Sequence, residues 1–231
     1  MVARDFVPET RFGFWFLGTE TWRIRVAKRA LDDLMRVAGT LPPSGGTVLD
    51  VGCGQGLALG LLAERFTPAK LIGIEADAHG LAAARTRILN EGIDAQLYHG
   101  DAQALPFESS SVDILFCHQT LHHLVHQDDA LREFHRVLKP GGYLLLAEST
   151  RAYIHSWIIR VLFRHPMHVQ RTAQEYLAML RTHGFEFSDR NVSLPYLWWS
   201  RNDLGAKEWF GFPVPTEREE TLVNVVARKK E

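Results

Sequence analysis

Residues 48–56, VLDVGCGQG, decide the fold of this chain. The run 47–51 is short, apolar and β-branched, which is typical of a buried parallel strand. Gly52, Gly54 and Gly56 follow it at alternate positions, and a helical pattern begins directly after them. Glycines at such a turn permit a positive φ and let a ligand approach the backbone closely. The stretch therefore predicts a ligand-binding turn between a strand and a helix.

The spacing of these glycines argues against a dinucleotide cofactor. The dinucleotide fingerprint is G-x-G-x-x-G, whereas here the spacing is G-x-G-x-G and Leu57 stands where the fingerprint has its third glycine. Asp50 lies two residues before the first glycine. A carboxylate there would repel a pyrophosphate but suits a ligand that carries an ammonium group. The turn is thus expected to bind a cofactor other than NAD.

The rest of the chain repeats the same strand–helix rhythm. Strands are predicted at 47–51, 71–74, 96–98, 112–117 and 143–147, and helices at 19–38, 57–66, 77–89 and 128–138, the last ending in a turn at 139–142. This alternation implies a parallel sheet with helices on both faces. Further on, the pattern predicts one helix over 151–165, a capped helix over 172–184, a sixth strand at 185–187 with residue 192, and a last strand at 221–227.

Length, charge and cysteine content narrow the class of protein. A chain of 231 residues suits a single domain, which we divide into an N-terminal helical cap (1–43), a cofactor-binding core (44–149) and substrate-covering insertions with the last strands (150–231). Because 26 Lys and Arg face 27 Asp and Glu, a net charge of -1 disfavours nucleic-acid binding. The first ten residues lack a signal-peptide pattern and the early apolar run 12–17 is too short to span a membrane. With only two cysteines, the expected location is cytoplasmic.

Five motifs in order resemble the class I S-adenosylmethionine-dependent methyltransferase family, most closely its small-molecule, ubiquinone-pathway-like subgroup. They are D-x-G-x-G-x-G at 50–56, Glu75, Gly100-Asp101-Ala102, 107–113 followed by Leu121-His122-His123-Leu124, and ALREFHRVLKPGG at 130–142. The resemblance is tight over 44–149. It implies an α/β, doubly wound, seven-stranded, mostly parallel, Rossmann-like sheet, with N-terminal and C-terminal insertions that cover the substrate.

The resemblance also implies S-adenosyl-L-methionine as the cofactor. In the family an acid at the position of Glu75 holds both ribose hydroxyls, and Asp101 lies near the adenine amino group. The sulfonium is already an activated electrophile, so the protein has mainly to hold a nucleophile in line with the methyl group. The expected cofactor-binding residues are Asp50, Gly52, Cys53, Gly54, Gly56, Glu75, Ala76, Asp101, Ala102, Cys117 and His118.

Histidines after the fourth strand are the candidates for proton removal from the substrate. His118 is the first candidate and His122 the second, because histidine titrates near neutral pH. Glu148, after the fifth strand, is an alternative base, and a purely structural role for the histidines stays open. His118 and His122 are four residues apart, a spacing used by helical zinc sites, but no H-E-x-x-H and no third ligand is evident. No metal is therefore predicted.

The six tryptophans all lie outside 47–149. Aromatic walls can stack a flat molecule or face a cation, which predicts an apolar or aromatic small-molecule substrate contacted by Trp15, Trp22, Trp157, Trp198 and Trp199. Alternatively, some of them pack the extra helices onto the sheet. The segment 151–165 would either cover the pocket or lie as an interfacial helix on a membrane surface. Two other functions also stay open, namely a reaction of the same cofactor without methyl transfer and a non-catalytic cofactor-binding protein. The oligomeric state is not determined by the sequence.

Overall fold

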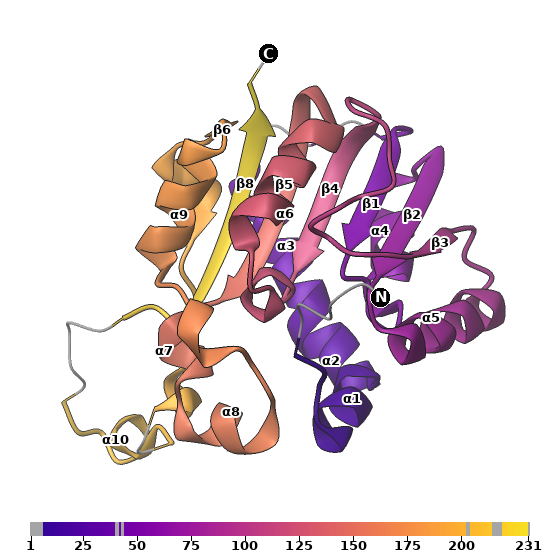
Figure 1. Cartoon of the computed structure of the whole chain (residues 1–231). Helices are drawn as coiled ribbons and strands as arrows, with labels where there is room; N and C mark the ends of the chain where they lie inside the picture. Colours follow the sequence, from indigo (N-terminus) through magenta and orange to yellow (C-terminus); the bar gives the residue numbers. More distant parts are fainter. Residues whose placement is uncertain (1–6, 40–41, 43, 202–203, 214–218, 231) are drawn as a thin grey trace.

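One sheet carries every strand in the described part of the chain (Figure 1). The structure is a computed structural model, and it describes residues 7–39, 42, 44–201, 204–213 and 219–230. The strands are β1 (Thr47–Val51), β2 (Lys70–Glu75), β3 (Gln96–His99), β4 (Val112–His118), β5 (Leu138–Ser149), β6 (Phe185–Glu186), β7 (Val192–Ser193) and β8 (Leu222–Lys229). Their order is β3-β2-β1-β4-β5-β8-β6, with β7 also paired to β8.

The pairing confirms the predicted doubly wound, mostly parallel sheet. β1 to β5 are parallel to one another, and β8 runs antiparallel to β5, β6 and β7. The predicted sixth strand exists as two short pieces, β6 and β7, which pair with different parts of β8. The path through the sheet thus has seven positions, the last of them divided. The strand order reverses between β1 and β4, and ligands of such sheets bind at that point, outside the carboxyl ends of the strands.

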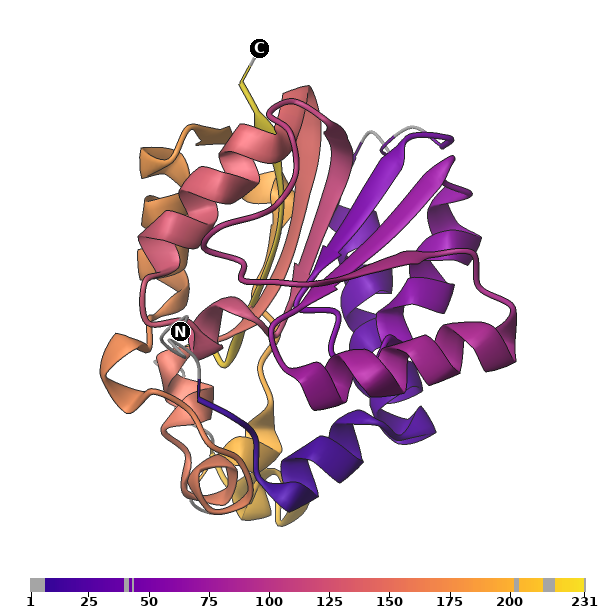
Figure 2. The same cartoon turned by 45° about the vertical axis from the view of Figure 1, so that its right-hand side comes forward.

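Helices cover both faces of the sheet (Figure 2). On one face α3 (Lys28–Val37) and α4 (Leu57–Phe66) bury residues such as Leu34 and Leu62 against the strands, and α5 (Ala78–Glu91) adds Ile88 at the margin. On the other face α6 (Gln127–Val137) and α9 (Ala173–Thr182) bury Phe134 and Tyr176. A strand between two such layers needs apolar residues on both sides, which explains the unbroken apolar runs in the sequence.

The remaining helices gather beyond the carboxyl ends of the parallel strands (Figure 1). They are α1 (Arg11–Leu17), α2 (Glu20–Trp22), α7 (Arg151–Ile154), α8 (Trp157–Leu162) and α10 (Ala206–Trp209). Although α1 and α8 are far apart in the sequence, Phe163 packs its ring against Phe12 and Phe16, with centroids 5.9 and 6.2 Å apart. The Gln55 side chain also donates a hydrogen bond to the carbonyl of Phe14, at 2.5 Å. The N-terminal helices therefore lie directly over the glycine turn.

Several local predictions need correction. The predicted helix 19–38 is continuous but contains a π-helical turn, Arg23–Ala27, between α2 and α3. The predicted single helix over 151–165 is wrong: Ser156 is extended (φ -61°, ψ 144°) and separates α7 from α8. This break lets Ile154 and Ile159 be buried while Trp157 stays exposed. The predicted turn at 139–142 lies within β5, whose pairing with β4 shifts register there.

Two predicted features at the other helices are confirmed. Thr172 and Glu175 form the capping box at the start of α9, where the Glu175 backbone N–H donates to Thr172 Oγ1 at 3.1 Å. Asp77 caps α5 through hydrogen bonds from two backbone N–H groups. Among the described residues, every helix is too short or too polar to cross a membrane.

Candidate active site

The glycine turn adopts the backbone conformation that its sequence predicts. Gly52, Gly54 and Gly56 have φ of 72°, 53° and 78°, a region that only glycine enters without strain. A Cβ at Gly52 would also collide with the Thr120 side chain, whereas the space beside Gly54 is open. The N–H groups of Gly52 and Cys53 donate to the carbonyl of Ile74, at 2.9 and 3.1 Å. These hydrogen bonds hold the turn against β2, and the open space beside Gly54 is left for a ligand.

Asp50, at the end of β1, is a buried carboxylate with an unsatisfied oxygen. Its side chain is 2% exposed and Oδ2 has no hydrogen-bond partner. Burial, with the nearby charge of Glu75, raises the pKa of Asp50 to about 8. A buried carboxylate is unfavourable unless a cation or hydrogen bonds compensate it. The site therefore fits a ligand that brings an ammonium group, as S-adenosylmethionine does.

Glu75, at the end of β2, lies beside the same turn. Its Oε2 accepts a hydrogen bond from the Gly54 N–H and its Oε1 from the Asp77 N–H, both at 2.8 Å. Burial raises the pKa of Glu75. Each carboxylate oxygen retains a lone pair for a further donor. The position is thus compatible with the expected contact to ribose hydroxyls, which stays a prediction.

A pocket of about 130 Å³ opens at the carboxyl ends of β1 and β4. Of the predicted cofactor residues, Asp50, Gly52, Cys53, Gly54 and His118 line it. The others, Gly56, Glu75, Ala76, Asp101, Ala102 and Cys117, do not line the pocket. Ala102 and Cys117 are buried in the core of the sheet. Asp101 accepts a hydrogen bond from the Gln103 N–H at 2.9 Å, in the turn that follows β3.

His118, the last residue of β4, presents a free nitrogen to this pocket. Its Nε2 is buried and has no hydrogen-bond partner. Burial lowers the pKa of His118 to about 4. Its ring stacks on Phe116, with centroids 5.8 Å apart, and lies 6.0 Å from the ring of Trp22. His118 is therefore a neutral imidazole that can accept a hydrogen bond from a molecule in the pocket.

Glu148 does not have the position of a free base. It is fully buried and absent from the pocket wall. Its Oε1 accepts hydrogen bonds from the N–H groups of Thr120 and Leu121, both at 2.8 Å, and its Oε2 lies 2.7 Å from His122 Nδ1. The prediction of a substrate base at Glu148 is therefore corrected: this carboxylate positions His122 and the loop that carries it.

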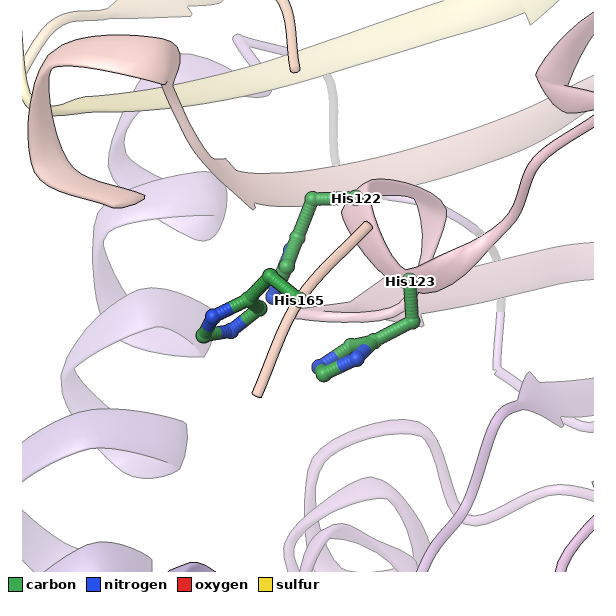
Figure 3. A group of neighbouring side chains, drawn as sticks. All are labelled: His122, His123 and His165. Atoms are coloured by element: carbon green, nitrogen blue, oxygen red, sulfur yellow. The ribbon is translucent and has the colours of Figure 1, made fainter. Parts of the chain in front are cut away.

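His165 is a site residue that sequence reasoning missed. The structure brings its ring to His122 and His123, with centroid distances of 5.1 and 4.8 Å, and Figure 3 shows the three side chains gathered in one place. Glu9 joins them, with Oε1 at 3.5 Å from His123 Nε2. The structure thus brings a third histidine to His122 and His123, which the sequence did not indicate. Since His165 lies 42 residues from His123 in the printed sequence, no spacing motif could have indicated this cluster.

The tryptophans divide into two groups in the structure. Trp22 lines the pocket, and Trp199 lies behind pocket residue Tyr153, with ring centroids 5.7 Å apart. Trp15, Trp157 and Trp198 are 63%, 46% and 39% exposed and do not line it. Their predicted contact with substrate is therefore not made through the pocket wall, and for Trp199 it is at most indirect.

Comparison with known proteins agrees with this site. Residues 49–146 match the family model described as a methyltransferase domain. The fatty-acid O-methyltransferase of Mycolicibacterium smegmatis is 36% identical over 114 residues, which cover 49% of this chain and 41% of that protein. The ubiquinone/menaquinone biosynthesis C-methyltransferase UbiE of Laribacter hongkongensis is 34% identical over 120 residues, covering 52% of this chain and 48% of that one. The chain spans less than half the length of either relative.

Solved structures show the same fold. A SAM-dependent methyltransferase from Aquifex aeolicus has a TM-score of 0.64 and 18% identity, covering 94% of this chain and 96% of that one. The [4+2]-cyclase SpnF has a TM-score of 0.66 and 22% identity, covering 89% and 82%. With the glycine turn, Asp50 and the sheet order already described, these matches identify residues 49–146 as a domain of the S-adenosylmethionine-dependent methyltransferase family. S-adenosylmethionine is the cofactor of that family, and when bound it supplies an electrophilic methyl group.

Proposed function

We propose that this chain transfers the methyl group of S-adenosylmethionine to a small apolar or aromatic molecule. The observation that carries the proposal is the buried, unpartnered carboxylate of Asp50, which lies in the same pocket as His118 and Trp22. The ammonium group of the cofactor would satisfy Asp50, and the acceptor would then lie between that end of the cofactor and the cap. In this proposal residues 44–149 bind the cofactor, and residues 1–43 and 150–231 enclose the acceptor.

The pocket wall supports an apolar acceptor. Beyond the glycine turn it is formed by rings and aliphatic side chains, among them Trp22, Ile159 and Phe163. Such walls exclude water and hold a flat or aliphatic molecule in one orientation, which is the main requirement for in-line transfer to an electrophile. His118 Nε2 is placed to accept a hydrogen bond from the O–H or N–H of the acceptor. The names of the relatives, which refer to a fatty acid and to quinones, point to the same substrate class.

Other expectations from the sequence belong to this proposal as well. A net charge of -1 disfavours a nucleic-acid substrate. At 117–120 the chain has CHQT, where base-methylating and glutamine-methylating relatives have Asn/Asp-Pro-Pro followed by an aromatic residue. The proposed setting of the reaction is the cytoplasm.

The test is a screen for S-adenosylhomocysteine release from the purified chain. Phenols, quinols, fatty acids, amines and thiols are supplied in turn, and the methylated product is identified by mass spectrometry. Trp22→Ala is expected to raise KM for the acceptor, because it removes a ring from the pocket wall. Trp209→Ala is the matched control, since that ring is 79% exposed and lies outside the wall. The proposal would be contradicted if no class of acceptor led to release of S-adenosylhomocysteine. It would also be contradicted if Trp22→Ala left KM for the acceptor unchanged.

A reaction without methyl transfer is the second candidate, because the fold is shared with a structure named as a [4+2]-cyclase. The same screen separates the two functions. An acceptor that is converted in the presence of S-adenosylmethionine, while no S-adenosylhomocysteine appears, identifies the second. Replacing the cofactor by S-adenosylhomocysteine sharpens the result, because only methyl transfer then stops.

A further inference from the structure

We propose that His122, His123 and His165, together with Glu9, form a binding site for a divalent transition-metal ion of the zinc class. The three histidines each offer a ring nitrogen, and these nitrogens all lie within 4.8 Å of one another. His122 and His123 belong to the short 3-10 helix after β4, and His165 follows α8, so two separate segments build the cluster (Figure 3). Imidazole nitrogen with carboxylate oxygen is a ligand set that zinc accepts.

His122 is held in the tautomer that a metal requires. Its Nδ1 lies 2.7 Å from Glu148 Oε2, and both groups are buried. Because the carboxylate only accepts hydrogen bonds, Nδ1 carries the proton and Nε2 is left with a free lone pair. A carboxylate behind a ligating histidine is the usual outer contact of protein metal sites, where it fixes the ring and raises its basicity.

Glu9 is placed as a fourth ligand beside these rings. Its Oε1 lies 3.5 Å from His123 Nε2, longer than a hydrogen bond of about 2.7–3.2 Å. Two ligands of a tetrahedral zinc ion, bound at about 2.0–2.1 Å, are separated by about 3.4 Å. Glu9 Oε2 is buried without a hydrogen-bond partner. A Cβ on Gly13 would collide with this oxygen, so the glycine provides the space that the carboxylate occupies.

The groups of the cluster lie close enough together to share one cation. One dication would satisfy Glu9 and the three nitrogens together.

The cluster is wider than a closed site. Two ligands of a tetrahedral zinc ion lie about 3.4 Å apart, and two ligands at 2.1 Å from one metal are at most about 4.2 Å apart, whereas the nitrogens are separated by up to 4.8 Å. His165 lies in an extended segment between α8 and Pro166, so a change in its side-chain torsions can close the difference. His122, in contrast, is fixed by Glu148.

The position of the site indicates its use. His122, His123 and His165 line the same pocket as Asp50 and His118. A bound dication that expands from four to five ligands would take a hydroxyl, enol or carboxylate oxygen of the acceptor as a ligand and lower the pKa of that group, so that its proton leaves to water. The methyl group would then pass from sulfur to that oxygen, leaving a neutral thioether. This last step rests on the proposed function, whereas the metal site does not.

The experiment measures metal binding without cofactor or acceptor, so its outcome is independent of methyl transfer. The full chain, produced without a histidine tag and stripped with a chelator, is titrated with zinc chloride in a calorimeter. A second titration with cobalt(II) chloride follows the visible absorption bands of a low-symmetry nitrogen and oxygen site. We expect one zinc ion per chain, at least a tenfold weaker affinity in His165→Ala, and about 10–100-fold weaker affinity in Glu148→Gln.

His168→Ala is the matched control, because this exposed histidine lies three residues beyond the cluster and is expected to leave the affinity unchanged. Circular dichroism checks that each variant is folded, and Glu9→Gln replaces His165→Ala if the latter is not. A chain that binds no zinc at a stoichiometric ratio overturns the proposal. So does a folded His165→Ala or Glu9→Gln variant that binds zinc as tightly as the unaltered chain.

Discussion

Glu148 Oε2 and His122 Nδ1 lie 2.7 Å apart in the buried layer beneath the pocket. The same carboxylate holds the backbone of Thr120 and Leu121 through its other oxygen. One side chain from β5 therefore sets both the path of the loop after β4 and the protonation of the ring that faces the pocket. Glu148 therefore acts on the site through His122 and the loop, although it does not line the pocket.

Glu148→Gln is expected to destabilise the chain by about 1–3 kcal/mol, because the neutral amide weakens the hydrogen bonds to both backbone donors and its NH2 group faces His122 Nδ1, which must then give up its proton and accept. Turnover should fall as well, since His122 loses its fixed tautomer. Urea unfolding and the rate of S-adenosylhomocysteine release measure the two effects. Glu108→Gln is the control, as that glutamate is exposed. Equal stability of both variants would show that the buried carboxylate is dispensable.

Asp50→Asn is expected to weaken S-adenosylhomocysteine binding by about 1.5–3 kcal/mol, because it removes a charge-assisted hydrogen bond to the ammonium group. Isothermal titration calorimetry gives the affinity directly. Asp94→Asn, on the exposed segment before β3, is the matched control. An affinity that is unchanged in Asp50→Asn would refute the assignment of the cofactor site.

Without cofactor, Asp50 should make stability fall as the pH rises. Its pKa is 3.8 ordinarily and about 8 in the folded chain, so the folded state binds the proton more tightly. Its contribution is fully present below pH 3.8 and is lost as the pH rises through 8. Asp50→Asn should therefore be the more stable protein at pH 8 while it binds the cofactor less well. Urea unfolding at several pH values tests this, and a variant less stable than the unaltered chain at pH 8 would contradict it.

Cofactor binding should release a proton near neutral pH. An ammonium group beside Asp50 lowers the raised pKa of this carboxyl, which then ionises. Calorimetric titration with S-adenosylhomocysteine at pH 7, in two buffers of different ionisation enthalpy, measures the number of protons released. The release should disappear in Asp50→Asn. Identical observed enthalpies in the two buffers for the unaltered chain would count against this linkage.

The glycine turn offers a comparison between two neighbouring positions. Gly52→Ala should destabilise the chain by about 2–4 kcal/mol, because it combines a positive φ with a collision against Thr120. Gly54→Ala should cost only about 1–2 kcal/mol, since the space beside it is open, but it should weaken cofactor binding by approaching the ligand. Thermal unfolding and calorimetry separate the two effects. A reversed order of stability would mean that Thr120 moves aside without cost.

The sequence alone determined the parallel sheet and the glycine turn. The run 48–56, the acid at Glu75 and the alternation of strands and helices are local patterns, and each depends on backbone conformation or on burial from both faces of the sheet. Those causes act within a few residues, so they can be recognised without knowing what the segment packs against. The predicted sheet and the placement of Asp50 and His118 at strand ends follow from them.

The arrangement of the segments over the glycine turn was decided only by tertiary structure. The break at Ser156 depends on which residues of 151–165 are buried when this segment packs over the end of the sheet. The periodicity of the sequence does not give this information. The two roles of Glu148 arise because β5 lies beside β4. The cluster of His165 with His122 and Glu9 joins three segments that are distant in the chain. Such contacts form only when the N-terminal helices and the segment 151–165 pack on the end of the sheet. This packing depends on the fold of the whole chain and not on any local pattern.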